Sequence, residues 1–102
     1  MENVSVKQLA TWQQEGRVFG LVDVREDFEH EHFNIGGTLI PLGDLMSRKA
    51  EIDKELPVVL YCEKGIRSVI AIQRLEGAGF HNLYNLEGGM KAYRLAKAAN
   101  QE

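Results

Sequence analysis

The sequence predicts an α/β fold in which one mainly parallel sheet is covered by helices on both faces. Segments with helical spacing of apolar residues alternate along the chain with short apolar runs of strand length. Such alternation is typical of parallel strands joined by right-handed crossovers. The length of 102 residues, with 44% hydrophobic and 26% charged residues, suits a chain that builds one core. We therefore expect a single domain over residues 1–102.

Helices are predicted where apolar residues recur at helical spacing between recognisable start and stop residues. The first follows Ser5, a favourable N-cap, and ends before Gly16, a common C-terminal breaker. A polar segment after residue 25 is expected to form one or two helical turns. In chain order, the expected helices are 6–15, 26–32, 42–52, 67–78 and 90–96.

Strands are predicted where short apolar runs are rich in β-branched residues. The clearest is 57–62, which opens with Pro57 and carries Cys62 at its carboxyl end. The Gly36-Gly37 pair breaks the chain before a minor strand that ends at Pro41. The expected strands are 18–24, 38–40, 57–62 and 83–86.

Composition excludes several classes of function. A net charge of −3 gives no support to nucleic-acid binding or to binding of anionic membranes. No apolar run approaches the roughly 20 residues of a membrane span, and the N-terminus lacks the apolar stretch of a secretory signal, so we expect a cytoplasmic protein. Cys62 has no second cysteine for an internal disulfide, and His30, His32 and His81 lack metal-ligand spacing. We expect no metal and no cofactor.

The segment that follows the clearest strand contains the candidate site. Ligands of open parallel sheets bind outside the carboxyl ends of strands, and Cys62 lies at such an end. Loop amides and the first N–H groups of the next helix can point at the sulfur, and they would favour the thiolate. An inert buried thiol is the alternative. We predict Cys62 as the nucleophile and the rest of the loop as the substrate-binding segment: Glu63, Lys64, Gly65, Ile66, Arg67 and Ser68.

Within this loop, three residues have specific expected roles. Gly65 permits the backbone angle that a tight curl requires. Arg67 adds positive charge, and Lys64 either does the same or is a solvated loop residue. The loop should therefore be locally cationic, in contrast to the acidic segment from Glu26 to Glu31.

Two residues end another predicted strand and so face the same edge of the sheet. Asp23 is expected to organise loop backbone by accepting hydrogen bonds. Arg25 is a candidate for the rim of the site, where it either pairs with Glu26, Asp27 or Glu87 or guides an anionic donor.

Four segments together resemble the single-domain rhodanese-like sulfurtransferases, in order and over nearly the whole chain. They are Leu21 to Glu26, Ile35 to Pro41, Cys62 to Ser68 and Leu86 to Tyr93. The resemblance implies a three-layer fold with a five-stranded parallel sheet, and it implies that Cys62 carries sulfane sulfur as a persulfide. It further implies a small anionic sulfur donor and a thiol, cyanide or protein acceptor.

The chain departs from the family pattern in two places. The family often has a His-x-Pro-Gly-Ala turn where this chain has Phe33-Asn34-Ile35-Gly36-Gly37. In this turn the chain is similar to rhodanese domains that are attached to enzymes activating ubiquitin-like sulfur carriers. That similarity raises the prospect of a protein acceptor. Tyr93 replaces the usual tryptophan of the C-terminal segment, a change between amphipathic aromatics that we interpret as structural.

The sequence therefore favours a thiosulfate sulfurtransferase-like enzyme that works through a Cys62 persulfide. A persulfide carrier that serves a protein partner, with low turnover of free thiosulfate, is the alternative, as is an inactive rhodanese fold. A phosphatase is disfavoured because four residues separate Cys62 from Arg67, whereas the related phosphatases resemble one another in having five. The choice between thiosulfate and mercaptopyruvate, and the oligomeric state, have no signal in the sequence.

Overall fold

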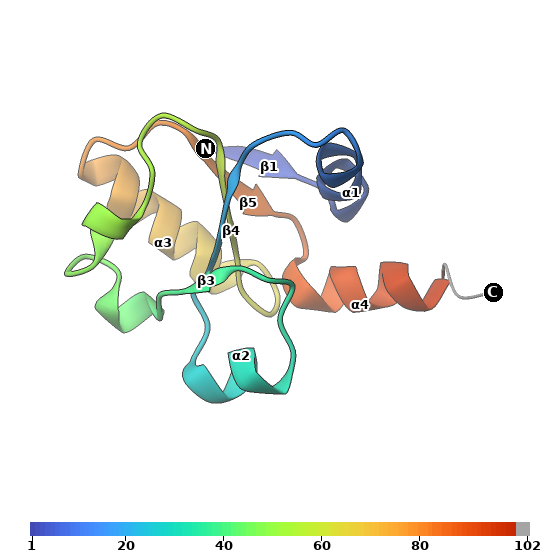
Figure 1. Cartoon of the computed structure of the whole chain (residues 1–102). Coiled ribbons are helices and arrows are strands. Elements are labelled where there is room, and N and C mark those ends of the chain that lie inside the picture. Colours follow the sequence, from blue (N-terminus) through green and yellow to red (C-terminus); the bar gives the residue numbers. More distant parts are fainter. Residues whose placement is uncertain (100–102) are drawn as a thin grey trace.

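The computed structural model describes residues 1–99, and within them five strands form one sheet flanked by four α-helices (Figure 1). The strands are β1 (Glu2–Val4), β2 (Gly20–Asp23), β3 (Thr38–Leu39), β4 (Val58–Tyr61) and β5 (Leu83–Leu86). The α-helices are α1 (Val6–Gln14), α2 (Asp27–His32), α3 (Ile66–Gly77) and α4 (Gly89–Ala99). Two short 3-10 helices, η1 (Leu42–Asp44) and η2 (Lys49–Glu51), lie between β3 and β4.

The strand order is β1-β5-β4-β2-β3, and every pair in the described part of the sheet is parallel. In the register of the central strands, Leu60 lies between Val22 and Asn85. The sequence prediction of a mainly parallel sheet is thereby confirmed. Strand β1 was not predicted, because a three-residue segment with two exposed residues carries no apolar pattern.

Side chains of the central strand alternate between two cores, one on each face of the sheet. Val58, Leu60 and Cys62 pack in the core that includes Ala71, Ile72 and Leu75 of α3. Val59 and Tyr61 pack in the opposite core, with Leu9 of α1 and Met90 of α4. Figure 1 shows the corresponding layers, with α3 on one side of the sheet and α1 and α4 on the other. Helices therefore cover both faces, as predicted.

Local signals set the ends of the first helix. The Ser5 side chain accepts a hydrogen bond from the Gln8 backbone N–H at 3.0 Å, and the Gln8 side chain accepts one from the Ser5 N–H at 2.9 Å. This reciprocal capping satisfies two donors that a helix start leaves free. The chain then turns at Gly16, whose φ is +69°. The predicted helix 6–15 is confirmed to within one residue.

The predicted helix over 42–52 is wrong. That segment consists of η1 and η2, joined by turns. Leu45 and Ile52 are both buried in the α3-side core, so the apolar spacing reflects real burial. Most backbone hydrogen bonds of the segment span three residues, as in the 2.8 Å bond from Asp44 N to Pro41 O and the 3.0 Å bond from Glu51 N to Arg48 O, and only Arg48 N also reaches four residues back. Gly43, a poor helix former, lies in the first turn.

Close packing explains the second glycine of the pair that precedes β3, and the backbone conformation explains the first. A Cβ atom on Gly37 would lie 2.7 Å from Cε1 and 3.0 Å from the hydroxyl oxygen of Tyr61. Gly36 has a φ of +92°, a left-handed conformation that side chains rarely adopt. The backbone therefore lies directly against the buried Tyr61 ring, and this approach leaves no space for a side chain.

No helix within residues 1–99 is both long enough and apolar enough to cross a bilayer.

Candidate active site

The candidate nucleophile immediately follows the central strand. Cys62 comes directly after β4, with 1% of its surface exposed, and α3 begins four residues later at Ile66. Between them the chain turns at Gly65, whose φ of +94° lies in the left-handed region. The structure therefore has the tight strand-to-helix loop, with glycine at the strained position, that the sequence predicts.

Two backbone amides and one hydroxyl surround the sulfur. The N–H of Gly65 donates to Cys62 Sγ at 3.1 Å, and the N–H of Ser68 donates at 3.3 Å. The Ser68 hydroxyl oxygen lies 3.4 Å from Sγ. Converging N–H groups stabilise negative charge on the atom that they face. The arrangement can thus hold a thiolate, or the negative charge of a sulfur bound to it.

A buried polar chain lies behind the sulfur. The Ser68 hydroxyl donates to the Asn85 side-chain oxygen at 2.5 Å, and the Asn85 amide donates to Asn3 Oδ1 at 3.2 Å. Ser68 and Asn85 are both at least 95% buried. Sequence reasoning missed Asn85, although a polar residue inside the apolar strand 83–86 was a signal that could have identified it.

The start of α4 holds the cysteine loop from outside. The Met90 N–H donates to the Cys62 carbonyl and the Lys91 N–H donates to the Glu63 carbonyl, each at 2.9 Å. Gly89 has a φ of +60°, and a Cβ there would lie 2.7 Å from the Glu63 oxygen. The Gly88-Gly89 pair therefore allows the helix start to contact the loop backbone directly.

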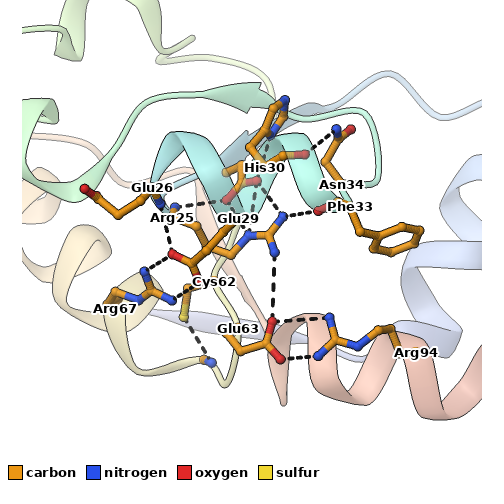
Figure 2. Close-up of polar contacts among 12 residues, drawn as sticks. Arg25, Glu26, Glu29, His30, Phe33, Asn34, Cys62, Glu63, Arg67 and Arg94 are labelled. Atoms are coloured by element: carbon orange, nitrogen blue, oxygen red, sulfur yellow. Dashed lines mark hydrogen bonds and ion pairs between the residues drawn. The ribbon is translucent and has the colours of Figure 1, made fainter.

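Ion pairs compensate much of the charge of the loop. The Arg67 guanidinium donates to both oxygens of Glu29 in α2, at 2.7 and 2.8 Å (Figure 2). Glu63 forms an ion pair with Arg94 of α4. Lys64 is exposed and has no ion-pair partner within residues 1–99. The loop still carries two cations against one carboxylate, but Glu29 compensates Arg67 and Arg94 compensates Glu63, so the positive charge predicted from the sequence is left at Lys64.

Arg25 is buried, with 2% of its surface exposed. Its guanidinium donates to both Asp23 oxygens and, at 2.6 Å, to the Phe33 carbonyl. Of the two alternatives expected for Arg25, the pair with Glu26, Asp27 or Glu87 is wrong, and guidance of an anionic donor stays a prediction. Arg25 instead pairs with Asp23, the last residue of β2, and a longer contact of 3.9 Å links it to Glu63 at the site.

Asp23 is the hub of this network. Its carboxylate accepts from the Arg25 backbone N–H at 2.9 Å and from His30 Nδ1 at 2.8 Å. Burial raises the pKa of Asp23, but hydrogen bonds from Arg25 and His30 outweigh burial, and the net shift is downward. The predicted role of Asp23 in ordering the following backbone is confirmed. Figure 2 shows how the Arg25 guanidinium connects Phe33, the residue after α2, to Glu63 of the cysteine loop.

The sulfur lies at the edge of an open hollow of about 310 Å³. Its lining consists of Glu29, Cys62, Glu63, Lys64, Ile66 and Arg67. A second hollow of about 620 Å³ also includes Glu29 and Glu63, and extends over Arg25, Phe28, His32, Phe33 and Arg94. Five of the seven predicted residues of the cysteine loop therefore line the hollow, whereas Gly65 and Ser68 are buried and contact the sulfur through their N–H groups. Helix α2 contributes a wall that sequence reasoning missed.

No cluster of three or more His, Cys, Asp or Glu side chains within residues 1–99 is placed to hold a metal ion.

A sheet with this strand order, a buried cysteine after its central strand and amides that converge on the sulfur is the arrangement that defines a protein family. The chain belongs to the rhodanese-like domain family, whose model matches residues 5–96. Its sheet and helices agree with solved rhodanese-like structures, including one from Staphylococcus aureus with a TM-score of 0.85 and 29% identity, over 91% of each chain.

Three curated relatives are 31% to 45% identical to the chain. The chain is 45% identical to the uncharacterized protein YqhL of Bacillus subtilis, over 72% of this chain and 59% of that protein. It is 33% identical to the probable adenylyltransferase/sulfurtransferase MoeZ of Mycobacterium tuberculosis, over 88% of this chain and 24% of that protein. With thiosulfate sulfurtransferase GlpE of Coxiella burnetii it shares 31% identity, over 87% of this chain and 85% of that one. The chain thus spans about three fifths of YqhL and a quarter of MoeZ.

Proposed function

We propose that this protein is a sulfurtransferase that moves sulfane sulfur from a donor such as thiosulfate to a thiophilic acceptor through a Cys62 persulfide. The observation that carries the proposal is the pair of amides, from Gly65 and Ser68, aimed at one sulfur atom at the edge of an open hollow. Family membership supports the same chemistry, and the similar GlpE protein is named a thiosulfate sulfurtransferase.

In the first half-reaction, the Cys62 thiolate attacks the outer sulfur of thiosulfate. A bond forms between Sγ and that sulfur, the bond to the sulfonate sulfur breaks, and sulfite leaves with the electron pair. The outer sulfur then carries negative charge near the N–H groups that face Sγ. Preorganised donors of this kind lower the free energy of a charged intermediate.

In the second half-reaction, cyanide, a small thiol or a protein thiol attacks the outer sulfur of the persulfide. The Cys62 thiolate leaves, and the protein returns to its starting state. No second cysteine within the chain is available to trap the persulfide as an internal disulfide. The solitary cysteine therefore suits a residue that holds one sulfur atom until an external acceptor arrives.

The amide arrangement also gives a reason to prefer sulfur transfer to phosphate-ester cleavage. The one guanidinium of the loop, Arg67, donates two hydrogen bonds to Glu29. A phosphoryl group has three outer oxygens to satisfy, whereas a persulfide has one terminal atom. Two amide donors therefore suit the single terminal sulfur of a persulfide better than the three oxygens of a phosphoryl group.

The test compares wild-type protein with Cys62→Ser, using thiosulfate and mercaptopyruvate as separate donors. Intact-mass measurement of wild type should show a gain of one sulfur atom that cyanide removes with release of thiocyanate. Cys62→Ser should show neither the adduct nor turnover. The proposal fails if wild type takes up no sulfur from any sulfane donor, or if an aryl phosphate is hydrolysed in a Cys62-dependent way without sulfur transfer.

A persulfide carrier that serves a protein partner is the second candidate. The pairing of Arg67 with Glu29 favours it, because a compensated arginine attracts a free anionic donor weakly. The similar YrkF protein of Bacillus subtilis, 33% identical over 70% of this chain, is named a putative sulfur carrier protein. Uptake of sulfur from a cysteine desulfurase, together with negligible thiosulfate turnover, would favour the carrier.

A further inference from the structure

Arg67 is the one guanidinium of the cysteine loop, and its hydrogen-bonding edge is occupied. Two of its nitrogens bond separately to the two oxygens of Glu29, the geometry in which arginine binds a carboxylate best. An oxyanion of a donor that bound this edge would need the same two nitrogens, and only the remaining N–H groups of Arg67 are open to it. The hydrogen bonds from Arg67 lower the pKa of Glu29 to about 2, so the competing carboxylate is charged at neutral pH.

The other arginines near the sulfur are also compensated. Arg25 is bound to Asp23, and Arg94 is bound to Glu63. In the lining of the hollow beside the sulfur, the charges of Glu29 and Glu63 equal those of Lys64 and Arg67. Because Arg94 already compensates Glu63, the exposed Lys64 is the one cation of this lining without an ion-pair partner among residues 1–99, and a donor that enters the hollow meets no free guanidinium.

The mouth of the site also presents apolar surface. Ile66 in the cysteine loop is 66% exposed, and Phe28 in α2 is 71% exposed. Ile66 lines the hollow beside the sulfur and Phe28 lines the second hollow, and the two hollows share Glu29. Apolar surface of this kind contributes contact area to an organic or peptide group and gives nothing to a small inorganic dianion.

The pair between Arg67 and Glu29 disfavours a compact dianionic donor. A compact dianion such as thiosulfate can bind the Nη1/Nη2 edge of Arg67 only by displacing Glu29, which leaves a carboxylate without its partner in a partly buried position. If Glu29 stays in place, the dianion must approach a carboxylate that repels it. A persulfide on an organic thiol brings its transferable sulfur without a sulfonate group, so it incurs neither cost.

Resting on the proposed function, we propose that Glu29 is a specificity-determining residue: by holding Arg67 it disfavours small dianionic donors and selects organic persulfides as the source of sulfur. In the favoured reaction the Cys62 thiolate attacks the outer sulfur of the donor persulfide R–S–SH. The bond from Sγ to the outer sulfur forms, the donor S–S bond breaks, and R–S⁻ leaves with the electron pair. The proton stays on the transferred sulfur, and the step needs no oxidant or reductant.

The experiment measures second-order rate constants for formation of the Cys62 persulfide, with thiosulfate and with cysteine persulfide as the two donors. Glu29→Gln removes the charge and releases Arg67. Glu31→Gln is the matched control, because Glu31 is exposed on the same helix and makes the same change in net charge. Glu29→Asp keeps the charge but shortens the side chain, and so serves as a second variant should Glu29→Gln fold poorly.

We expect Glu29→Gln to raise the thiosulfate rate constant about tenfold, a change of roughly 1.4 kcal/mol in the free energy of the transition state. The cysteine persulfide rate constant should change less than about twofold. Glu31→Gln should leave both within about twofold, and Glu29→Asp should give a gain of about threefold with thiosulfate. Adding Arg67→Gln to Glu29→Gln should remove the thiosulfate gain, because the released guanidinium is its cause.

Three results would overturn the inference. The thiosulfate gain of Glu29→Gln could equal that of Glu31→Gln, which would reduce the effect to general charge. Glu29→Gln could raise the rate constant with cysteine persulfide as much as that with thiosulfate. The thiosulfate gain could also persist in the double variant that lacks Arg67. The failure of the proposed function has a different signature, since wild-type Cys62 would then form no persulfide with either donor.

Discussion

The contact between the start of α4 and the cysteine loop can be tested by adding one methyl group. Gly89→Ala would place a Cβ 2.7 Å from the Glu63 carbonyl oxygen and closer still to that of Cys62. Both obstacles are backbone atoms, which cannot rotate away as a flexible side chain can. The φ of +60° adds a second penalty, because residues with a Cβ rarely adopt that conformation.

The size of the effect follows from these two penalties. The left-handed conformation costs alanine about 1 kcal/mol or slightly more. Relief of the clash requires the helix start to move from the loop, which breaks the 2.9 Å bonds from Met90 N to the Cys62 carbonyl and from Lys91 N to the Glu63 carbonyl. At about 1 kcal/mol for each bond, the loss of unfolding free energy should reach about 3 kcal/mol.

Gly16→Ala supplies the control. Gly16 has a similar φ of +69°, but a Cβ there would meet no atom within 4 Å. It should therefore lose only the conformational part, about 1 kcal/mol.

Urea unfolding of the two variants gives the free energies, and the rate of Cys62 persulfide formation reports on the loop. Gly89→Ala should be about 2 kcal/mol less stable than Gly16→Ala, and it alone should slow persulfide formation. Equal destabilisation by the two substitutions, with equal rates at Cys62, would refute the claim that the α4 start holds the cysteine loop in place.

Three further predictions concern packing, pH and the buried polar chain. Gly37→Ala should destabilise the fold by about 2 kcal/mol in urea unfolding, because its Cβ would lie 2.7 Å from the Tyr61 ring; an unchanged midpoint would contradict the packing. The folded-state pKa of Glu29 is lowered from 4.5 to about 2, so its pair with Arg67 stabilises the protein above pH 4.5, and this contribution is lost as pH falls toward 2. Glu29→Gln should therefore flatten the stability profile between these pH values, and an unchanged acid limb would argue against the pair. Asn85→Ala should lower the free energy of unfolding by about 2 kcal/mol, measured by thermal or urea unfolding, because Ser68 and Asn3 each lose their hydrogen-bond partner. A loss below about 0.5 kcal/mol would show that the buried polar chain contributes little to stability.

Features that depend on neighbouring residues could be predicted from the sequence. The position of Cys62 after β4 follows from an apolar run of strand length, and the left-handed turn at Gly65 follows from the need to reverse direction before α3. The capped start of α1 is signalled by Ser5 and its spacing from the first apolar residues. Each of these depends on fewer than ten consecutive residues.

Features that depend on distant partners could not be predicted. Arg67 and Glu29 are 38 residues apart, and Glu63 and Arg94 are 31 apart. A sequence shows how many charges a segment carries, but only the crossing of α2 over the cysteine loop decides which of them meet. The same limit applies to Arg25, because the partners of a buried guanidinium depend on which acceptors the folded chain brings next to it. The assignment of Cys62 as nucleophile stays a prediction until its persulfide is measured.

The pairing of β1 with β5 has a consequence for how the protein folds. Asn3 and Asn85 lie side by side in that pairing although 82 residues separate them along the chain. Contacts of such long range require closure of a large loop and so form late, after more local structure. During synthesis, the first strand must therefore wait for nearly the whole domain to leave the ribosome. The polar chain behind the sulfur is completed only at that moment, and a nascent chain with α3 already formed would still lack the back wall of its active site.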